Sequence, residues 1–104
     1  MNATPLDTAY DVAADALWVS RELPRRKTRE FRACLARWLA WDALHNNLAV
    51  TKIDIARMAG YNHVTVLHGL KQVEAMKSDR GFRMDVERAQ VELRKAMRKY
   101  KAQA

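Results

Sequence analysis

Residues Thr51 to Glu74, which read TKIDIARMAGYNHVTVLHGLKQVE, decide how the rest of this chain is interpreted. Their pattern is typical of two short helices joined by a turn. Thr51, followed three residues later by Asp54, forms an approximate capping box for the first helix. Gly60 can adopt a positive φ and end that helix, and Asn62 can cap the next one. Two helices with a glycine in the turn are typical of a helix-turn-helix, whose second helix enters the DNA major groove.

The apolar residues of this stretch predict which faces are buried. The first helix is expected to bury Ile53, Ile55, Ala56 and Met58. The second helix is expected to bury a longer set at helical spacing, namely Val66, Leu67, Leu70, Val73 and Met76.

The opposite face of the second helix carries the candidate DNA-reading residues. Val64 lies two positions before Val66, about 200° away around the helix, so it should point outward. Polar groups beside it suit base edges, and methyl groups suit thymine. The expected major-groove contacts are Asn62, His63, Val64, Thr65 and His68. The alternative is an ordinary helical corner with a solvated outer face, because such spacing also occurs in proteins that bind no DNA.

Residues 60–74, GYNHVTVLHGLKQVE, resemble a known signature, G-G-R-D-H-T-T-V-I/L-H-A-x-x-K-I-E. It belongs to the C-terminal DNA-binding domain of the bacterial replication initiator DnaA. The similarity extends back to DIA at 54–56 and forward to SDRGFR at 78–83 and DVER at 85–88, and covers roughly 28–97. The resemblance implies an all-α, Trp-repressor-like helix-turn-helix domain that recognises short asymmetric DNA boxes as a monomer.

The chain departs from that signature where the family reads bases. The family has Arg-Asp-His-Thr-Thr where this chain has Tyr61-Asn62-His63-Val64-Thr65. Asn62 donates as well as accepts hydrogen bonds, unlike aspartate, and Val64 lacks a hydroxyl. Binding to double-stranded DNA is still expected, at sites similar to the family's box, and these departures leave open whether the family's own box is recognised.

Length and composition predict one all-α domain over residues 1–104, with about five helices. No apolar run is long enough to span a membrane, and the N-terminus lacks a signal peptide's apolar segment. The single cysteine, Cys34, lies in an apolar helical run and is expected to be a buried, reduced thiol. These features favour a cytoplasmic protein. The resemblance to the DnaA domain implies a bacterial or phage origin.

The charge is strongly basic but unevenly spread. The net charge is +7, yet residues 1–23 hold four acidic residues and one arginine. Basic residues follow at 25–29, in the connector between the leading helix and the central helix, and around the helix-turn-helix. Phosphates are expected to bind at these residues. The expected phosphate contacts are Arg25, Arg26, Lys27, Arg29, Thr51, Lys52 and Lys71. The resemblance places Arg32 in the minor groove, with Arg29 or Arg37 as alternatives if the alignment slips.

The remaining segments are expected to build the core around this motif. Residues 1–23 form an acidic leading helix, whose buried stripe is Leu6, Tyr10, Ala13 and Leu17. The central core helix is expected at 29–44, within a DNA-binding core of 25–97, and 94–104 form a basic tail. The last helix carries an apolar stripe at helical spacing, namely Phe82, Val86, Ala89, Leu93, Met97 and Tyr100.

The chain carries no constellation typical of an enzyme. It has no phosphate-binding loop of the G-x-x-x-x-G-K-[ST] type, no metal-ligand spacing and no activated nucleophile. We therefore expect no catalysis, cofactor, metal or small-molecule substrate. The expected function is a sequence-preferring double-stranded DNA-binding regulator of replication or transcription. The alternative is an adaptor that uses the acidic leading helix and Trp18 to bind a replication or transcription protein.

Overall fold

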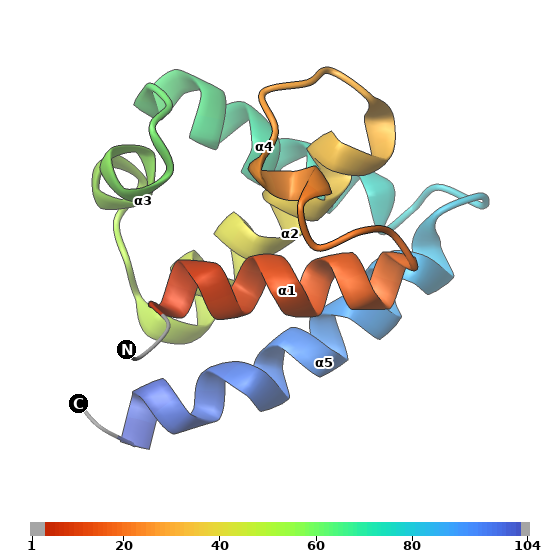
Figure 1. The fold of residues 1–104 in the computed structure, drawn as a ribbon. Helices are drawn as coiled ribbons and strands as arrows, with labels where there is room; N and C mark the ends of the chain where they lie inside the picture. Colours follow the sequence, from red (N-terminus) through yellow and green to blue (C-terminus); the bar gives the residue numbers. More distant parts are fainter. Residues whose placement is uncertain (1–3, 103–104) are drawn as a thin grey trace.

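Five α-helices and one short 3-10 helix follow one another in the computed structural model, which describes residues 4–102 (Figure 1). Residues 1–3 of the leading segment and 103–104 of the basic tail lie outside the described residues. The elements are α1 (Pro5–Leu17), η1 (Leu23–Arg25), α2 (Phe31–Leu48), α3 (Lys52–Ala59), α4 (His63–Met76) and α5 (Arg83–Ala102). No strand occurs in this part of the chain, so the prediction of a single all-α domain with about five helices is confirmed.

Side-chain caps start three of the helices, and the sequence predicted those at Thr51 and Asn62. Thr4 and Asp7 form a reciprocal capping box at α1, followed by Pro5. The Thr51 hydroxyl accepts the Asp54 amide at 3.1 Å and starts α3. The Asn62 Oδ1 accepts the Thr65 amide at 2.9 Å and starts α4.

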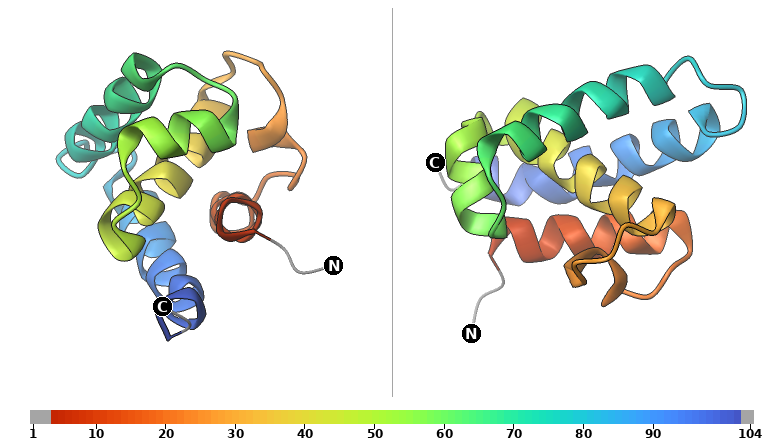
Figure 2. Two further views of the ribbon diagram at one scale, coloured as in Figure 1. Left: turned by 90° about the vertical axis from the view of Figure 1, so that its left-hand side faces the viewer. Right: turned by 90° about the horizontal axis from the view of Figure 1, so that it is seen from above.

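Helix α2 is the central element of the core. Its side chains Leu35, Leu39, Trp41 and Leu44 are fully buried, and it packs against α1, α4 and α5. Both views of Figure 2 place α1 and α4 on opposite sides of α2. The prediction of a central helix is confirmed, although α2 begins two residues later and ends four residues later than the expected 29–44. Helix α3 packs mainly on α4 and covers one end of the molecule.

The buried stripes of α1 and α5 are also confirmed. All four predicted residues of α1 are buried. The α5 stripe is buried from Val86 to Met97, and its ends, Phe82 and Tyr100, are half-buried against the core. In α4, however, the fully enclosed line is Val66, Gly69 and Val73, while Leu67, Leu70 and Met76 are only half-buried.

The predicted inner face of α3 is wrong at two positions. Ile53 is 58% exposed and Met58 is 45% exposed, and only Ile55 and Ala56 are buried from the predicted set. The physical reason is that α3 has eight residues and packs mainly on α4 and less extensively on α2. A short helix at the edge of the core buries only the side that faces these neighbours, so apolar residues beside that side stay in solvent.

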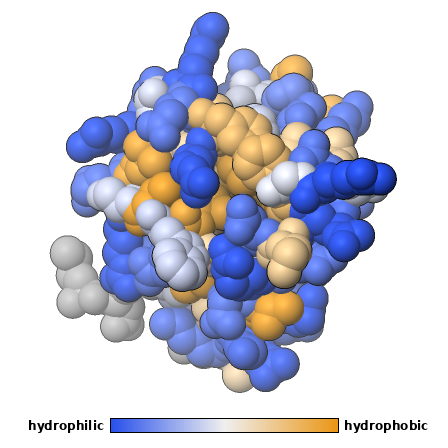
Figure 3. All heavy atoms as spheres, turned by 90° about the vertical axis from the view of Figure 1, so that its right-hand side faces the viewer, coloured by the Kyte–Doolittle hydropathy of each residue, from blue (hydrophilic) through white to orange (hydrophobic). Residues whose placement is uncertain are grey.

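An apolar area lies at the end of the molecule where α1 ends and α2 and α5 begin. Figure 3 shows apolar side chains gathered on this face and surrounded by hydrophilic residues. The rings of Phe31 and Phe82 lie 4.8 Å apart, and Trp18 is 81% exposed. Trp18 ends α1 with φ at 62°, a left-handed conformation that is rare for a bulky residue.

One acidic side chain, Asp42, is buried between α2 and α5 beside a polar cavity of about 230 Å³. Its carboxylate accepts the amides of Asn46 at 2.7 Å and Gln90 at 3.2 Å. Burial disfavours the charged form and raises the pKa of Asp42 above its usual 3.8.

We predict that Gly69→Ala destabilises the protein although alanine is the better helix former. A methyl group at Gly69 would lie 2.4 Å from Cδ1 of Trp38, a contact that forces the ring or the helix to move. Overpacking of this kind costs about 1–3 kcal/mol, against a gain of about 1 kcal/mol in helix propensity. Urea unfolding measures the change, and Glu74→Ala at an exposed site of the same helix serves as the control. A Gly69→Ala protein more stable than the wild type would contradict the packing.

We predict that Asp42→Asn changes how stability depends on pH. Because the pKa of Asp42 is raised in the folded chain, the unfolded chain releases this proton first, near 3.8. Wild-type stability therefore falls as pH rises from there through the folded pKa. The pKa of Asp15 is lowered through its bond with Arg21, which has the opposite effect, but both proteins share that residue. Relative to the wild type, Asp42→Asn should thus become more stable as the pH rises from 3.8 through the folded pKa of Asp42. Parallel stability profiles would contradict this account.

Candidate nucleic-acid interface

The first turn of α4 faces outward from the molecule. Asn62, His63 and His68 are exposed, Val64 is 60% exposed, and Thr65 is half-buried. The turn before it consists of residues 60–62, with Gly60 at a φ of 77° that favours glycine. The Asn62 side chain accepts both the amide and the hydroxyl of Thr65 through Oδ1, which leaves its amide nitrogen directed elsewhere. The five predicted base-contacting residues therefore belong to one helical start that α1 does not cover.

Tyr61 and Lys27 fix this turn against the connector. The Lys27 Nζ donates to the carbonyl of Gly60 at 2.6 Å and lies 3.8 Å from the centroid of the Tyr61 ring. The Tyr61 ring also packs edge-on against Trp41, at 5.2 Å between centroids. In the sequence Tyr61 stands out only as a departure from the family signature, and its structural role was not predicted. The feature of the sequence that could have indicated this role is an aromatic residue directly after the turn glycine, in a chain whose basic segment offers a cation to pack on the ring.

Arg37 is buried and organises the connector from within. It is 5% exposed, and its guanidinium donates to the carbonyls of Arg26 and Thr28, both at 2.6 Å, and to the Cys34 sulfur at 3.2 Å. Arg37 is therefore not placed to enter a DNA groove. Cys34, expected to be buried, is half-buried beside it.

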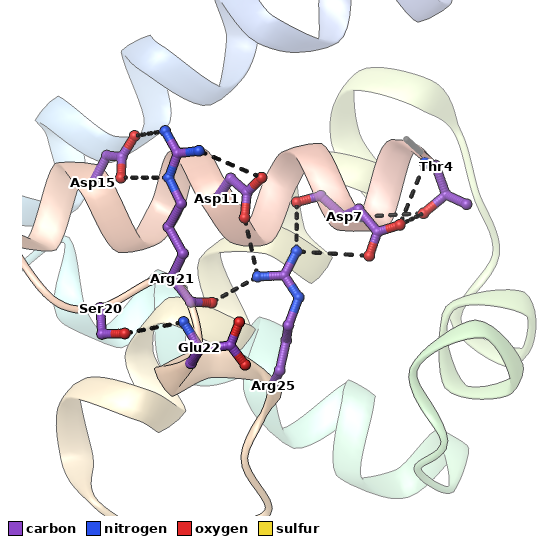
Figure 4. Close-up of polar contacts among 8 residues, drawn as sticks. All are labelled: Thr4, Asp7, Asp11, Asp15, Ser20, Arg21, Glu22 and Arg25. Carbon is purple, nitrogen blue, oxygen red and sulfur yellow. Dashed lines mark hydrogen bonds and ion pairs between the residues drawn. The ribbon is translucent and has the colours of Figure 1, made fainter. Parts of the chain in front are cut away.

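Three aspartates of α1, Asp7, Asp11 and Asp15, form an acidic ridge that pairs with two arginines of the segment after the helix (Figure 4). Arg25 Nη1 lies 3.0 Å from Asp11, and Arg25 Nη2 lies 3.6 Å from Asp7. Arg21 makes a 2.7 Å ion pair with Asp15. This pairing directs the Arg25 side chain toward α1, so we leave Arg25 out of the candidate interface. The ridge thus holds Arg21 and Arg25 against α1, a role that was not predicted from the sequence.

The structure also separates the arginines considered for the minor groove. Arg32 Nη1 donates to the carbonyl of Leu17 at 3.0 Å, at the end of α1. Arg29, in contrast, lines the same cavity as Thr65 and His68 of α4. Arg37 lines this cavity too but is buried, so Arg29 is the exposed arginine of the three that lies beside α4.

The remaining predicted phosphate contacts surround the two helices. Lys52 is exposed at the start of α3 beside its cap, Thr51, which is exposed as well. Lys71 is exposed two turns into α4, and Arg26 is exposed in the connector. All four offer hydrogen-bond donors to a phosphate.

Neither a membrane-spanning helix nor a metal-binding cluster occurs among the described residues. No helix among them combines the length and apolar character needed to cross a bilayer. No group of three or more His, Cys, Asp or Glu residues within 4–102 lies close enough to hold a metal ion.

Comparison with known proteins gives no relative: no family model, curated protein or solved structure matches this chain. The functional interpretation therefore depends on the geometry described above and on the residues that resemble the DnaA signature.

Proposed function

We propose that this chain is a double-stranded DNA-binding protein that reads sequence with the first turn of α4. The observation that carries the proposal is the outward, uncovered start of α4, where Asn62, His63 and Val64 are exposed. A helix presented in this way fits the major groove, with its N-terminal residues at the base edges. Exposed cations on the connector and on α3 lie on the flanks, where phosphates would pass.

Each side chain of the proposed interface has a distinct role. The Asn62 amide nitrogen and the His63 ring offer hydrogen bonds to bases, and Val64 offers its methyl groups to thymine. Arg29 takes the minor-groove role that the resemblance suggested for Arg32. The phosphates are bound by Arg26, Lys27, Thr51, Lys52 and Lys71, and Lys27 also secures the turn.

The resemblance to the DnaA C-terminal domain suggests the biological setting. A protein of this kind would occupy short, asymmetric boxes as a monomer and regulate replication or transcription in a bacterium or phage. Because Tyr61 is tied to Lys27 and Trp41, it is unavailable for the base contact that the family's arginine would make. The preferred box is therefore expected to differ from the family's.

We predict that the double variant His63→Ala, Thr65→Ala loses sequence preference but keeps general DNA binding. A duplex selected by the wild type from a random pool is compared with a shuffled duplex at two salt concentrations. Each lost base contact should reduce the preference by roughly 1–3 kcal/mol. The slope of log affinity against log salt should stay close to that of the wild type, because the phosphate contacts remain.

Arg29→Ala and Arg32→Ala form a matched pair for the same assay. Arg29→Ala should weaken binding and reduce the salt slope by about 1, because a cation that lies in the minor groove, between the two phosphate backbones, is lost. Arg32→Ala should leave the slope unchanged, since its guanidinium is bonded at the end of α1. Equal effects of the two variants would contradict the placement of Arg29.

A second candidate function is favoured by the exposed Trp18. Large aromatic side chains are rarely this exposed, and they are enriched where proteins bind partners. In this alternative the chain is an adaptor that binds a replication or transcription protein and keeps α3 and α4 as a scaffold. The acidic ridge is paired with Arg21 and Arg25, so the contact would centre on Trp18 and the apolar area of Figure 3. Absence of DNA binding by the wild type at low salt would favour this alternative.

A further inference from the structure

A cavity of about 540 Å³ lies between the connector, α2 and the start of α4. Its volume falls within the range of roughly 300–1,000 Å³ that is typical of small-molecule sites. Three cations, Lys27, Arg29 and Arg37, line it together with three aromatic residues, Trp38, Trp41 and Tyr61. No carboxylate belongs to this lining.

The cations give the cavity a positive potential. Arg37 is nearly enclosed, and its hydrogen bonds go to two carbonyls and a thiol, none of which carries a full negative charge. No carboxylate lies within ion-pair distance of Arg37 in the part of the chain that the structure describes. A cleft lined by one sign of charge with low-dielectric walls concentrates that charge's field. An anion entering it would supply the missing counter-charge.

The aromatic residues give the same cavity flat apolar walls. Trp41 and Tyr61 meet edge-on at 5.2 Å, and Trp38 meets His68 edge-on at 5.8 Å. Trp38 is held in place because it packs directly on Gly69. Ring edges and faces fixed in this way suit a planar aromatic ring. The lining therefore combines an anion-binding side with an aromatic one.

We propose that this cavity binds a small planar aromatic molecule carrying a phosphate or carboxylate group, and that the bound molecule alters DNA binding. The ring lies against Trp38, and the anionic group faces Arg29 and Arg37. Thr65 and His68 line the cavity from α4, so its occupant touches two residues of the proposed reading surface. The effect on DNA rests on the proposed function, whereas the ligand site does not.

The test titrates the full chain with two probes that share a ring and an anion, 5′-AMP and indole-3-acetate. Calorimetry follows both probes. Adenosine and inorganic phosphate are the separated parts of 5′-AMP, and indole and acetate are those of indole-3-acetate. At least one probe should bind with saturation at one site per chain, about tenfold more tightly than either part, because both halves of the cavity contribute. The better probe also distinguishes a phosphate ligand from a carboxylate ligand.

Two variants of equal charge change locate the binding. Arg29→Ala should weaken the better probe at least about fivefold, because it removes a cation from the lining. Arg98→Ala, at an exposed site on α5, should leave the affinity unchanged. Circular dichroism checks that both variants fold. No saturable binding, phosphate binding as tight as the full probe, or equal losses in the two variants would overturn the site.

A DNA titration at saturating probe then tests the second part of the proposal. A change of about threefold or more in DNA affinity supports coupling between the cavity and α4. An unchanged affinity overturns the coupling and leaves the ligand site intact. A wild-type chain that binds the probe but no DNA overturns both the coupling and the proposed function.

Discussion

The buried guanidinium of Arg37 is the interaction on which the rest of the structure depends. It ties the carbonyls of Arg26 and Thr28 to α2, and so fixes a connector that has no regular structure of its own after η1. With the connector in place, Lys27 reaches the carbonyl of Gly60 and covers the Tyr61 ring. One enclosed cation thus positions the turn before α4. It does so with bonds to two carbonyls and a thiol, so no carboxylate partner cancels its charge.

A second electrostatic arrangement sorts the basic residues of the connector. Asp7, Asp11 and Asp15 attract Arg21 and Arg25 toward α1, on the opposite side of α2 from α4. Lys27 and Arg29 remain on the side of α4. The acidic helix therefore does more than keep the protein in solution: it decides which cations stay available near the proposed DNA surface.

Local chemistry made much of the fold predictable from sequence. Thr4, Thr51 and Asn62 cap helices through bonds to residues three positions away, and the α5 stripe follows helical periodicity. The sequence could not predict the contacts of four arginines, Arg25, Arg29, Arg32 and Arg37. Their side chains are identical and lie within thirteen residues, so they differ only in the groups that the fold brings near them. The exposure of Ile53 and Met58 depends likewise on how few neighbours α3 has. The candidate base-contacting residues were placed on the outer face at the start of α4, with His68 one turn further on, from helical periodicity, and their DNA binding is still a prediction.

The close packing of Trp38 on Gly69 has a consequence for how α4 meets any partner. A ring seated where even one methyl group would collide leaves α4 no room to slide or roll along α2. The helix is thus preorganised, and it would lose little conformational entropy on the proposed docking of a rigid duplex. In the proposed complex, the fit between the groove and a fixed α4 should then decide which duplexes bind. A duplex whose groove does not match should bind weakly, because α4 cannot shift to fit it.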